Sequence, residues 1–122
     1  MLPRISSSDG KEALQRWKEA RSEARKPARE DVATAVRYTL ALLSDAHPGS
    51  AVEVRVPPYG ATQVLPGVSH RRGTPPAVVE MDPQTWLDLA TGNLGWAQAA
   101  DEGLIDASGE RTDLSDLLPV SA

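Results

Sequence analysis

A chain of 122 residues is long enough for one domain with a single core and too short for two. The absence of cysteine excludes disulfides, thiolate nucleophiles and cysteine metal sites. The net charge of −4 argues against nucleic-acid binding, which requires a basic surface. The hydrophobic fraction of 40% and the charged fraction of 25% indicate a globular protein, with a core that contains no Phe.

The first predicted element is an amphipathic helix over residues 9–26. Asp9 is its predicted N-cap, and Leu14 and Trp17 lie on a narrow apolar stripe. Its basic residues could face a membrane or an acidic partner. Glutamates alternate with them at helical pairing distances, however, and this favours a solvated face. The basic residues are Arg16, Lys18, Arg21, Arg25 and Lys26.

A second helix is predicted after Pro27, because Glu30 and Asp31 favour the positive end of a helix. Its apolar residues recur at helical intervals and form a wider stripe, which predicts that it packs on the core. The sequence His47-Pro48-Gly49 ends it, since proline cannot continue the hydrogen-bond ladder.

The hydrophobic period then changes from helical to alternating, with Val52, Val54 and Val56 on one face of a predicted strand. A turn at residues 57–60 leads to a returning strand, so an antiparallel meander is expected. Its further strands are predicted at residues 61–65, 68–72 and 77–81.

Asp82 and Pro83 open a helix as N-cap and first helical residue, and Gly92 ends it. A short helix from Gly95 to Glu102 and a strand from Leu104 to Ser108 follow. A last, short amphipathic helix is expected to close on an apolar surface through Leu114, Leu117 and Leu118.

Residues for catalysis are scarce. His47 lies in a helix-ending turn, and the carboxylates occupy caps and turns. His70 stands beside Arg71 and Arg72 without a nucleophile, so an enzyme that works through His70 is the minority hypothesis. No phosphate loop, zinc-binding helix or nucleophile elbow occurs. We therefore expect a non-enzymatic protein with no catalytic residue, no metal and no cofactor.

A cationic cluster is the remaining polar candidate. On a meander, Arg55, His70 and Arg72 could approach one another near Tyr59 and Arg71, and present donors to a carboxylate or phosphate head group or to a partner. Alternatively, Glu53 and Glu80 pair with these arginines across the sheet, which we favour.

No apolar run approaches the roughly 20 residues that span a bilayer, and the first residues lack the apolar centre of a secretory signal. The sequence therefore predicts a cytoplasmic protein with no membrane span and no nucleic-acid partner.

The C-terminal half carries a family resemblance. Asp82-Pro83-Gln84-Thr85-Trp86-Leu87, then Gly92, Trp96-Ala97-Gln98-Ala99 and Gly103-Leu104-Ile105-Asp106-Ala107-Ser108-Gly109 resemble the sterol carrier protein 2 (SCP2) family over about residues 77–118. The runs 54–61 and 72–76, each with paired prolines, are similar to a short actinobacterial branch of sterol carrier family proteins.

The resemblance implies an α+β fold with a mostly antiparallel five-stranded sheet, covered on one face by helices, and an apolar tunnel between the two layers. Residues 1–27 would be an N-terminal helical extension and residues 28–122 the SCP2-like domain. The C-terminal helix would act as a lid.

Carried onto this sequence, the resemblance predicts a binding site for an apolar small molecule such as a sterol or a fatty acyl chain. The alternative is a protein-interaction or accessory module, in which the Trp17 helix and the arginine-bearing loops dock another protein or a second copy of the chain. The predicted lining is Val56, Trp86, Leu89, Ala90, Leu104, Ile105, Leu114, Leu117 and Leu118.

Overall fold

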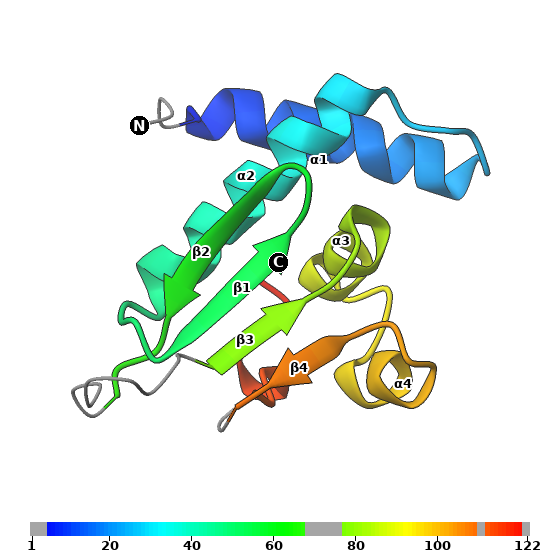
Figure 1. Ribbon diagram of the computed structural model, residues 1–122. Helices are drawn as coiled ribbons and strands as arrows, with labels where there is room; N and C mark the ends of the chain where they lie inside the picture. Colours follow the sequence, from blue (N-terminus) through cyan, green and yellow to red (C-terminus); the bar gives the residue numbers. More distant parts are fainter. Residues whose placement is uncertain (1–4, 68–76, 110–111, 121–122) are drawn as a thin grey trace.

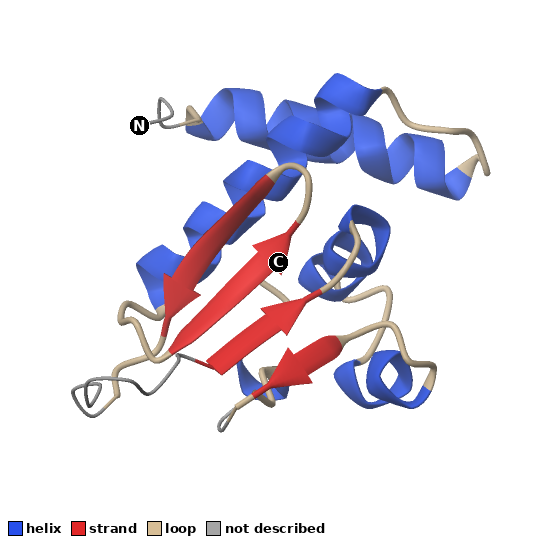
Figure 2. Ribbon diagram, viewed as in Figure 1, coloured by secondary structure: helices blue, strands red, loops and turns tan. Residues whose placement is uncertain are grey.

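Helices lie behind a twisted sheet in the computed structural model, which describes residues 5–67, 77–109 and 112–120 (Figures 1 and 2). The predicted α+β class is confirmed. The elements in chain order are α1 (Ser7–Ser22), α2 (Arg29–Ala46), β1 (Val52–Val56), β2 (Gly60–Val64), β3 (Ala77–Glu80), α3 (Pro83–Thr91), α4 (Trp96–Asp101), β4 (Asp106–Ser108) and the short 3₁₀ helix η1 (Ser115–Leu117).

The sheet is mixed, and its described strands are four in the order β2-β1-β3-β4. Strand β1 pairs with β2 in the antiparallel sense and with β3 in the parallel sense, with Val54 opposite Val79. The predicted antiparallel meander is therefore wrong, because β3 joins β1 in the parallel sense. Two of the three described pairings are antiparallel, and the described residues form four of the five strands predicted. The strand predicted at residues 68–72 lies outside the described residues.

Burial explains why β3 joins β1 rather than β2. Strand β3 would run in the same direction whether it paired with β1 in the parallel sense or with β2 in the antiparallel sense. The local hydrophobic pattern therefore cannot distinguish the two pairings. Beside β1, however, Val79 and Ala77 extend the apolar face of Val52 and Val54, and all four side chains are buried. Beside β2, they would neighbour a strand whose residues are mostly exposed or half-buried.

The two faces of the sheet differ. Alternate β1 residues point toward the helices and are fully buried, whereas Glu53 and Arg55 lie on the opposite face. Figure 2 shows this second face uncovered. A sheet covered on one side alternates in this way because one face packs on the core and the other contacts water.

A buried hydrogen bond joins α3 to α2. The indole nitrogen of Trp86 donates to Thr39 Oγ1 at 2.8 Å, and both residues are completely buried. The Thr39 hydroxyl in turn donates to the carbonyl oxygen of Ala35 at 2.7 Å. This chain satisfies the polar groups that the two side chains bring into the core.

Helix α1 is shorter than predicted and begins earlier. Its N-cap is Ser6, whose side chain accepts a hydrogen bond from the backbone N–H of Asp9, the residue predicted as the cap. The apolar stripe, including Leu14 and Trp17, is buried in the same core cluster as the sheet. The helix packs closely on α2, since a Cβ at Gly10 would overlap the ring of Tyr38.

The start and end predicted for α3 are confirmed. Asp82 caps the helix by accepting from the backbone N–H of Thr85 at 2.8 Å, and Pro83 is the first helical residue. Gly92 ends it with a φ of 84°, a left-handed conformation that a residue with a Cβ disfavours.

Gly10→Ala tests the close contact between α1 and α2. We expect a loss of about 1–3 kcal/mol in the free energy of unfolding, because the added methyl overpacks against Tyr38. Gly95→Ala is the control, since no heavy atom beyond its chain neighbours lies within 4 Å of the added Cβ. Urea denaturation would measure both, and equal stabilities of the two variants would contradict the contact.

Thr39→Val tests the buried hydrogen bond. Valine keeps the shape but leaves the Trp86 N–H without an acceptor, so we expect a loss of about 1–3 kcal/mol in the free energy of unfolding. Thr91→Val is the comparison, since the Thr91 hydroxyl, among the described residues, donates to backbone carbonyls of its own helix, Leu87 and Asp88. A Thr39→Val protein as stable as the parent would show that the hydrogen bond contributes nothing.

Candidate ligand-binding sites

Most of the predicted lining gathers in the interior between helices and sheet. Five of its side chains are at most 1% exposed, and the structure places them together in one hydrophobic core. Ile105, Leu117 and Leu118 are partly buried and pack against that core. Leu104 is separate, with 37% of its surface exposed. The five buried residues are Val56, Trp86, Leu89, Ala90 and Leu114.

The C-terminal segment, residues 112–120, covers this interior on the helix side of the sheet (Figure 1). Its Leu114 side chain is completely buried. Within the described residues, one backbone hydrogen bond ties the segment to the rest of the fold, from Val120 N to the carbonyl oxygen of Ala90 at 2.9 Å. The segment is thus held mainly by apolar packing.

A side-chain turn shapes the start of that segment. The Asp113 carboxylate accepts a hydrogen bond from the backbone N–H of Ser115 at 3.0 Å, and this bond lowers the pKa of Asp113 below its ordinary value. The predicted terminal helix is only the short η1 turn. Leu118 has an extended backbone because Pro119 follows, and a residue before proline disfavours the helical region.

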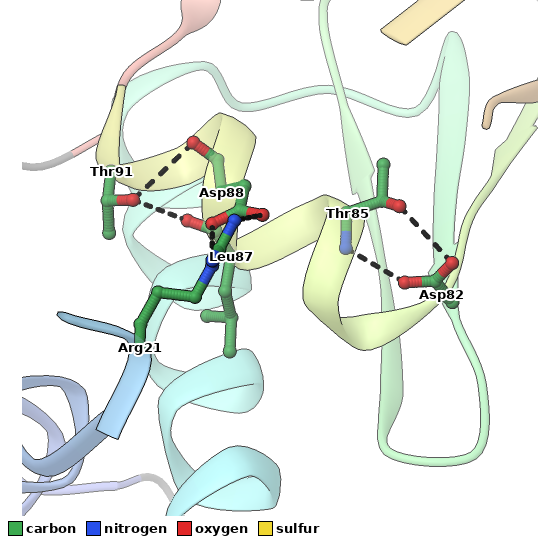
Figure 3. A network of polar contacts seen from close by, with 6 residues as sticks. All are labelled: Arg21, Asp82, Thr85, Leu87, Asp88 and Thr91. Atoms are coloured by element: carbon green, nitrogen blue, oxygen red, sulfur yellow. Dashed lines mark hydrogen bonds and ion pairs between the residues drawn. The ribbon is translucent and has the colours of Figure 1, made fainter. Parts of the chain in front are cut away.

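Helix α3, which carries Trp86 and Leu89, is fixed at both ends (Figure 3). At its start, both Asp82 oxygens accept hydrogen bonds from Thr85. Near its end, Arg21 of α1 donates two hydrogen bonds of 3.1 Å to the carboxylate of Asp88. The Arg21 side chain is 47% exposed and that of Asp88 only 7%. The carboxylate raises the pKa of Arg21, so the guanidinium stays charged.

The predicted cationic cluster is only partly described. Arg55 lies on the uncovered face of the sheet, where its guanidinium pairs with Glu53, and the pKa of Arg55 is raised first by that hydrogen bond. The sequence favoured pairing across the sheet, whereas this pair lies along one strand, β1. Tyr59 lies instead near α1 and α2. His70, Arg71 and Arg72 lie outside the described residues.

A surface groove of about 490 Å³ lies where α1, α2 and α3 meet the turn between β1 and β2. Sequence reasoning missed it, although the run Arg25-Lys26-Pro27-Ala28-Arg29 between the first two helices was a usable signal. We call it the cationic groove. It is lined by Trp17, Arg21, Ala24, Arg25, Lys26, Pro27, Arg29, Val32, Tyr59, Pro83 and Gln84.

A family model described as "Bacterial SCP ortholog" matches residues 28–120. This chain belongs to that SCP2-like sterol carrier family. The match covers the sheet and every helix after α1 in this sterol carrier domain, and it contains the whole predicted apolar lining. No curated protein matches the chain. The actinobacterial branch stays a prediction.

Helix α1 precedes the family match but packs into the same core as the matched residues. Trp17 is only 2% exposed, so the apolar stripe of α1 is occupied within the chain. A partner that docks on α1 would therefore contact its polar face. Docking of another protein or a second copy stays a prediction.

Residues 5–67, 77–109 and 112–120 contain neither a candidate metal cluster nor a candidate membrane span. There, the acidic and histidine side chains form no group of three that could hold a metal ion. None of the helices in those ranges has both the length and the apolar character needed to cross a bilayer.

Arg21→Ala tests the ion pair that fixes α1 to α3. It leaves the Asp88 carboxylate nearly buried and unpaired, and we expect a loss of about 1–3 kcal/mol in the free energy of unfolding, less than for a fully buried pair because Arg21 is half exposed. Arg21→Ala combined with Asp88→Ala should recover part of it. A double variant less stable than Arg21→Ala alone, measured by urea denaturation, would contradict this account.

Proposed function

We propose that this domain binds an apolar, lipid-like small molecule between its helices and its sheet, and makes or breaks no covalent bond in it. Family membership supports a carrier role. The observation that carries the proposal is the fully buried Leu114 side chain, delivered to the apolar interior by a segment with little backbone attachment. A guest would enter by displacing that segment.

When a guest replaces Leu114 in the interior, the free energy lost by exposing Leu114 is offset by the free energy gained by burying the guest. Moving Leu114 out of the core exposes apolar surface to water, at about 25 cal/mol per Å². A guest that fills the same space buries its own apolar surface and that of Trp86 and Leu89, so the two terms have similar size and opposite sign. Binding therefore needs a guest with more apolar surface than one leucine side chain, as an acyl chain or a sterol has.

The lining supports binding rather than catalysis. Its members are Val, Trp, Leu, Ala and Ile, whose side chains supply no general acid, general base or nucleophile for a bound guest. Among them, the one polar group is the Trp86 N–H, which already donates to Thr39. A site of this composition favours apolar molecules by burial and offers little to orient a reacting bond.

Leu117→Gln tests the position of the site. Leu117 is half-buried in the C-terminal segment and packs against the core. A polar amide there should weaken binding of a fluorescent fatty acid by about tenfold, because an unpaired polar group at an apolar surface costs roughly 1–3 kcal/mol. Competition with the unlabelled fatty acid would give the affinities, after circular dichroism confirms folding.

Val78→Gln is the matched control, because Val78 is also half-buried but lies in β3 on the face with Glu53 and Glu80. Its affinity for the fatty acid should stay within about twofold of that of the parent. If Leu117→Gln binds as well as Val78→Gln, the guest does not lie beneath the C-terminal segment.

A further inference from the structure

The charge of the cationic groove is unusual for this chain. The whole protein carries a net charge of −4, yet the groove lining contains three arginines, one lysine and no carboxylate. Two of the arginines are engaged elsewhere, Arg21 with Asp88 and Arg25 with Glu23. Lys26 and Arg29 form no ion pair with any described residue, and both are exposed. These two cations remain available to an anion.

The loop between α1 and α2 carries Lys26 and leads to Arg29, the first residue of α2, and it has a defined backbone. The N–H of Arg25 donates to the carbonyl oxygen of Ala20 at 2.8 Å, and that of Ala24 donates to Arg21 at 3.3 Å. Ala24 has a φ of 54°. The loop therefore leaves α1 through a hydrogen-bonded reversal, which restricts where Lys26 can reach.

The groove also has an apolar part. Trp17 and Val32 contribute from α1 and α2, and Pro83 from the start of α3. Tyr59 is half-buried in the wall, held by the hydrogen bond of 2.9 Å from Arg37 Nε to its carbonyl oxygen. The Tyr59 hydroxyl forms no hydrogen bond with another described residue, so it is free to bind a ligand.

We propose that the cationic groove binds a small aromatic carboxylate. The ring would pack against Tyr59, Val32 and Pro83, which are half-buried, while the carboxylate accepts charge-assisted hydrogen bonds from Lys26 and Arg29. The volume of about 490 Å³ lies in the usual range for small-molecule sites. Arginine and aromatic side chains both pack favourably on flat rings, which favours an aromatic body over a flexible chain.

This site is separate from the interior of the proposed carrier function. Of its lining residues, Trp17, Arg21, Ala24, Arg25, Lys26 and Pro27 precede the family match, and none belongs to the predicted apolar lining. The proposal does not depend on lipid binding, and each can fail without the other.

Isothermal titration of the full chain with 2-naphthoate tests the proposal. Lys26→Ala combined with Arg29→Ala should weaken binding at least tenfold, because both charge-assisted bonds are lost. The control combines Lys11→Ala with Lys18→Ala, which removes the same charge from α1 outside the groove and should change the affinity less than twofold. Equal losses in the two double variants would show that only net charge matters and would overturn the site.

Two further ligands separate the contribution of the aromatic ring to the affinity from that of the anionic group. The neutral analogue 2-naphthol and inorganic phosphate alone should each bind at least tenfold more weakly than 2-naphthoate, since each supplies only half of the recognition. Equal affinity for 2-naphthol would overturn the role of the cations, and equal affinity for phosphate would overturn that of the ring.

The Leu117→Gln variant distinguishes the groove from the interior. It should bind 2-naphthoate as the parent does, even where it loses the fluorescent fatty acid. If it loses 2-naphthoate as well, the ring enters the interior and the groove proposal is wrong. Failure of the parent to bind 2-naphthoate at millimolar concentration would also overturn the proposal, and would leave the carrier function untouched.

Discussion

The hydrogen bond from the Trp86 indole to the Thr39 hydroxyl is the constraint on which the arrangement of layers depends. It joins α3 to α2 in the middle of the apolar interior, where an unpaired polar group is costly. Hydrophobic packing alone would allow the two helices to slide or rotate over the sheet. A buried hydrogen bond with one donor and one acceptor allows far fewer positions, because it depends on distance and angle.

Around that fixed pair, the chain closes its core with two segments of different strength. Helix α1 is tied by the Arg21 pair to Asp88 and by its close approach at Gly10. The C-terminal segment is tied by the packing of Leu114 and one described backbone hydrogen bond to Ala90. Local opening is easiest where few hydrogen bonds must break. The two proposed sites differ in the same way. The groove is formed partly by the firmly held α1, whereas the interior is covered by the weakly held C-terminal segment.

Some predictions from the sequence were wrong or incomplete, and each has a physical reason. The alternating pattern of β1 identified a half-buried strand, but strand partners are set by burial between segments that are distant in sequence. Strand β3 therefore pairs with β1 beside Val54, and not in a meander. The predicted terminal helix is only a short turn, because Pro119 keeps the backbone of Leu118 out of the helical region. The cationic groove was missed because its cations lie at the end of α1, in the following loop and at the start of α2, while Tyr59 and Pro83 come from later elements.

The sequence by itself determined what depends on neighbouring residues. The cap of Asp82, the left-handed end at Gly92, the alternation of β1 and the family membership are local or compositional properties, and each is confirmed. Only the tertiary structure decided what depends on distance. The parallel pairing of β1 with β3, the burial of Trp17 and the meeting of α1, α2 and α3 at a groove result from long-range packing, which local sequence periodicity does not encode.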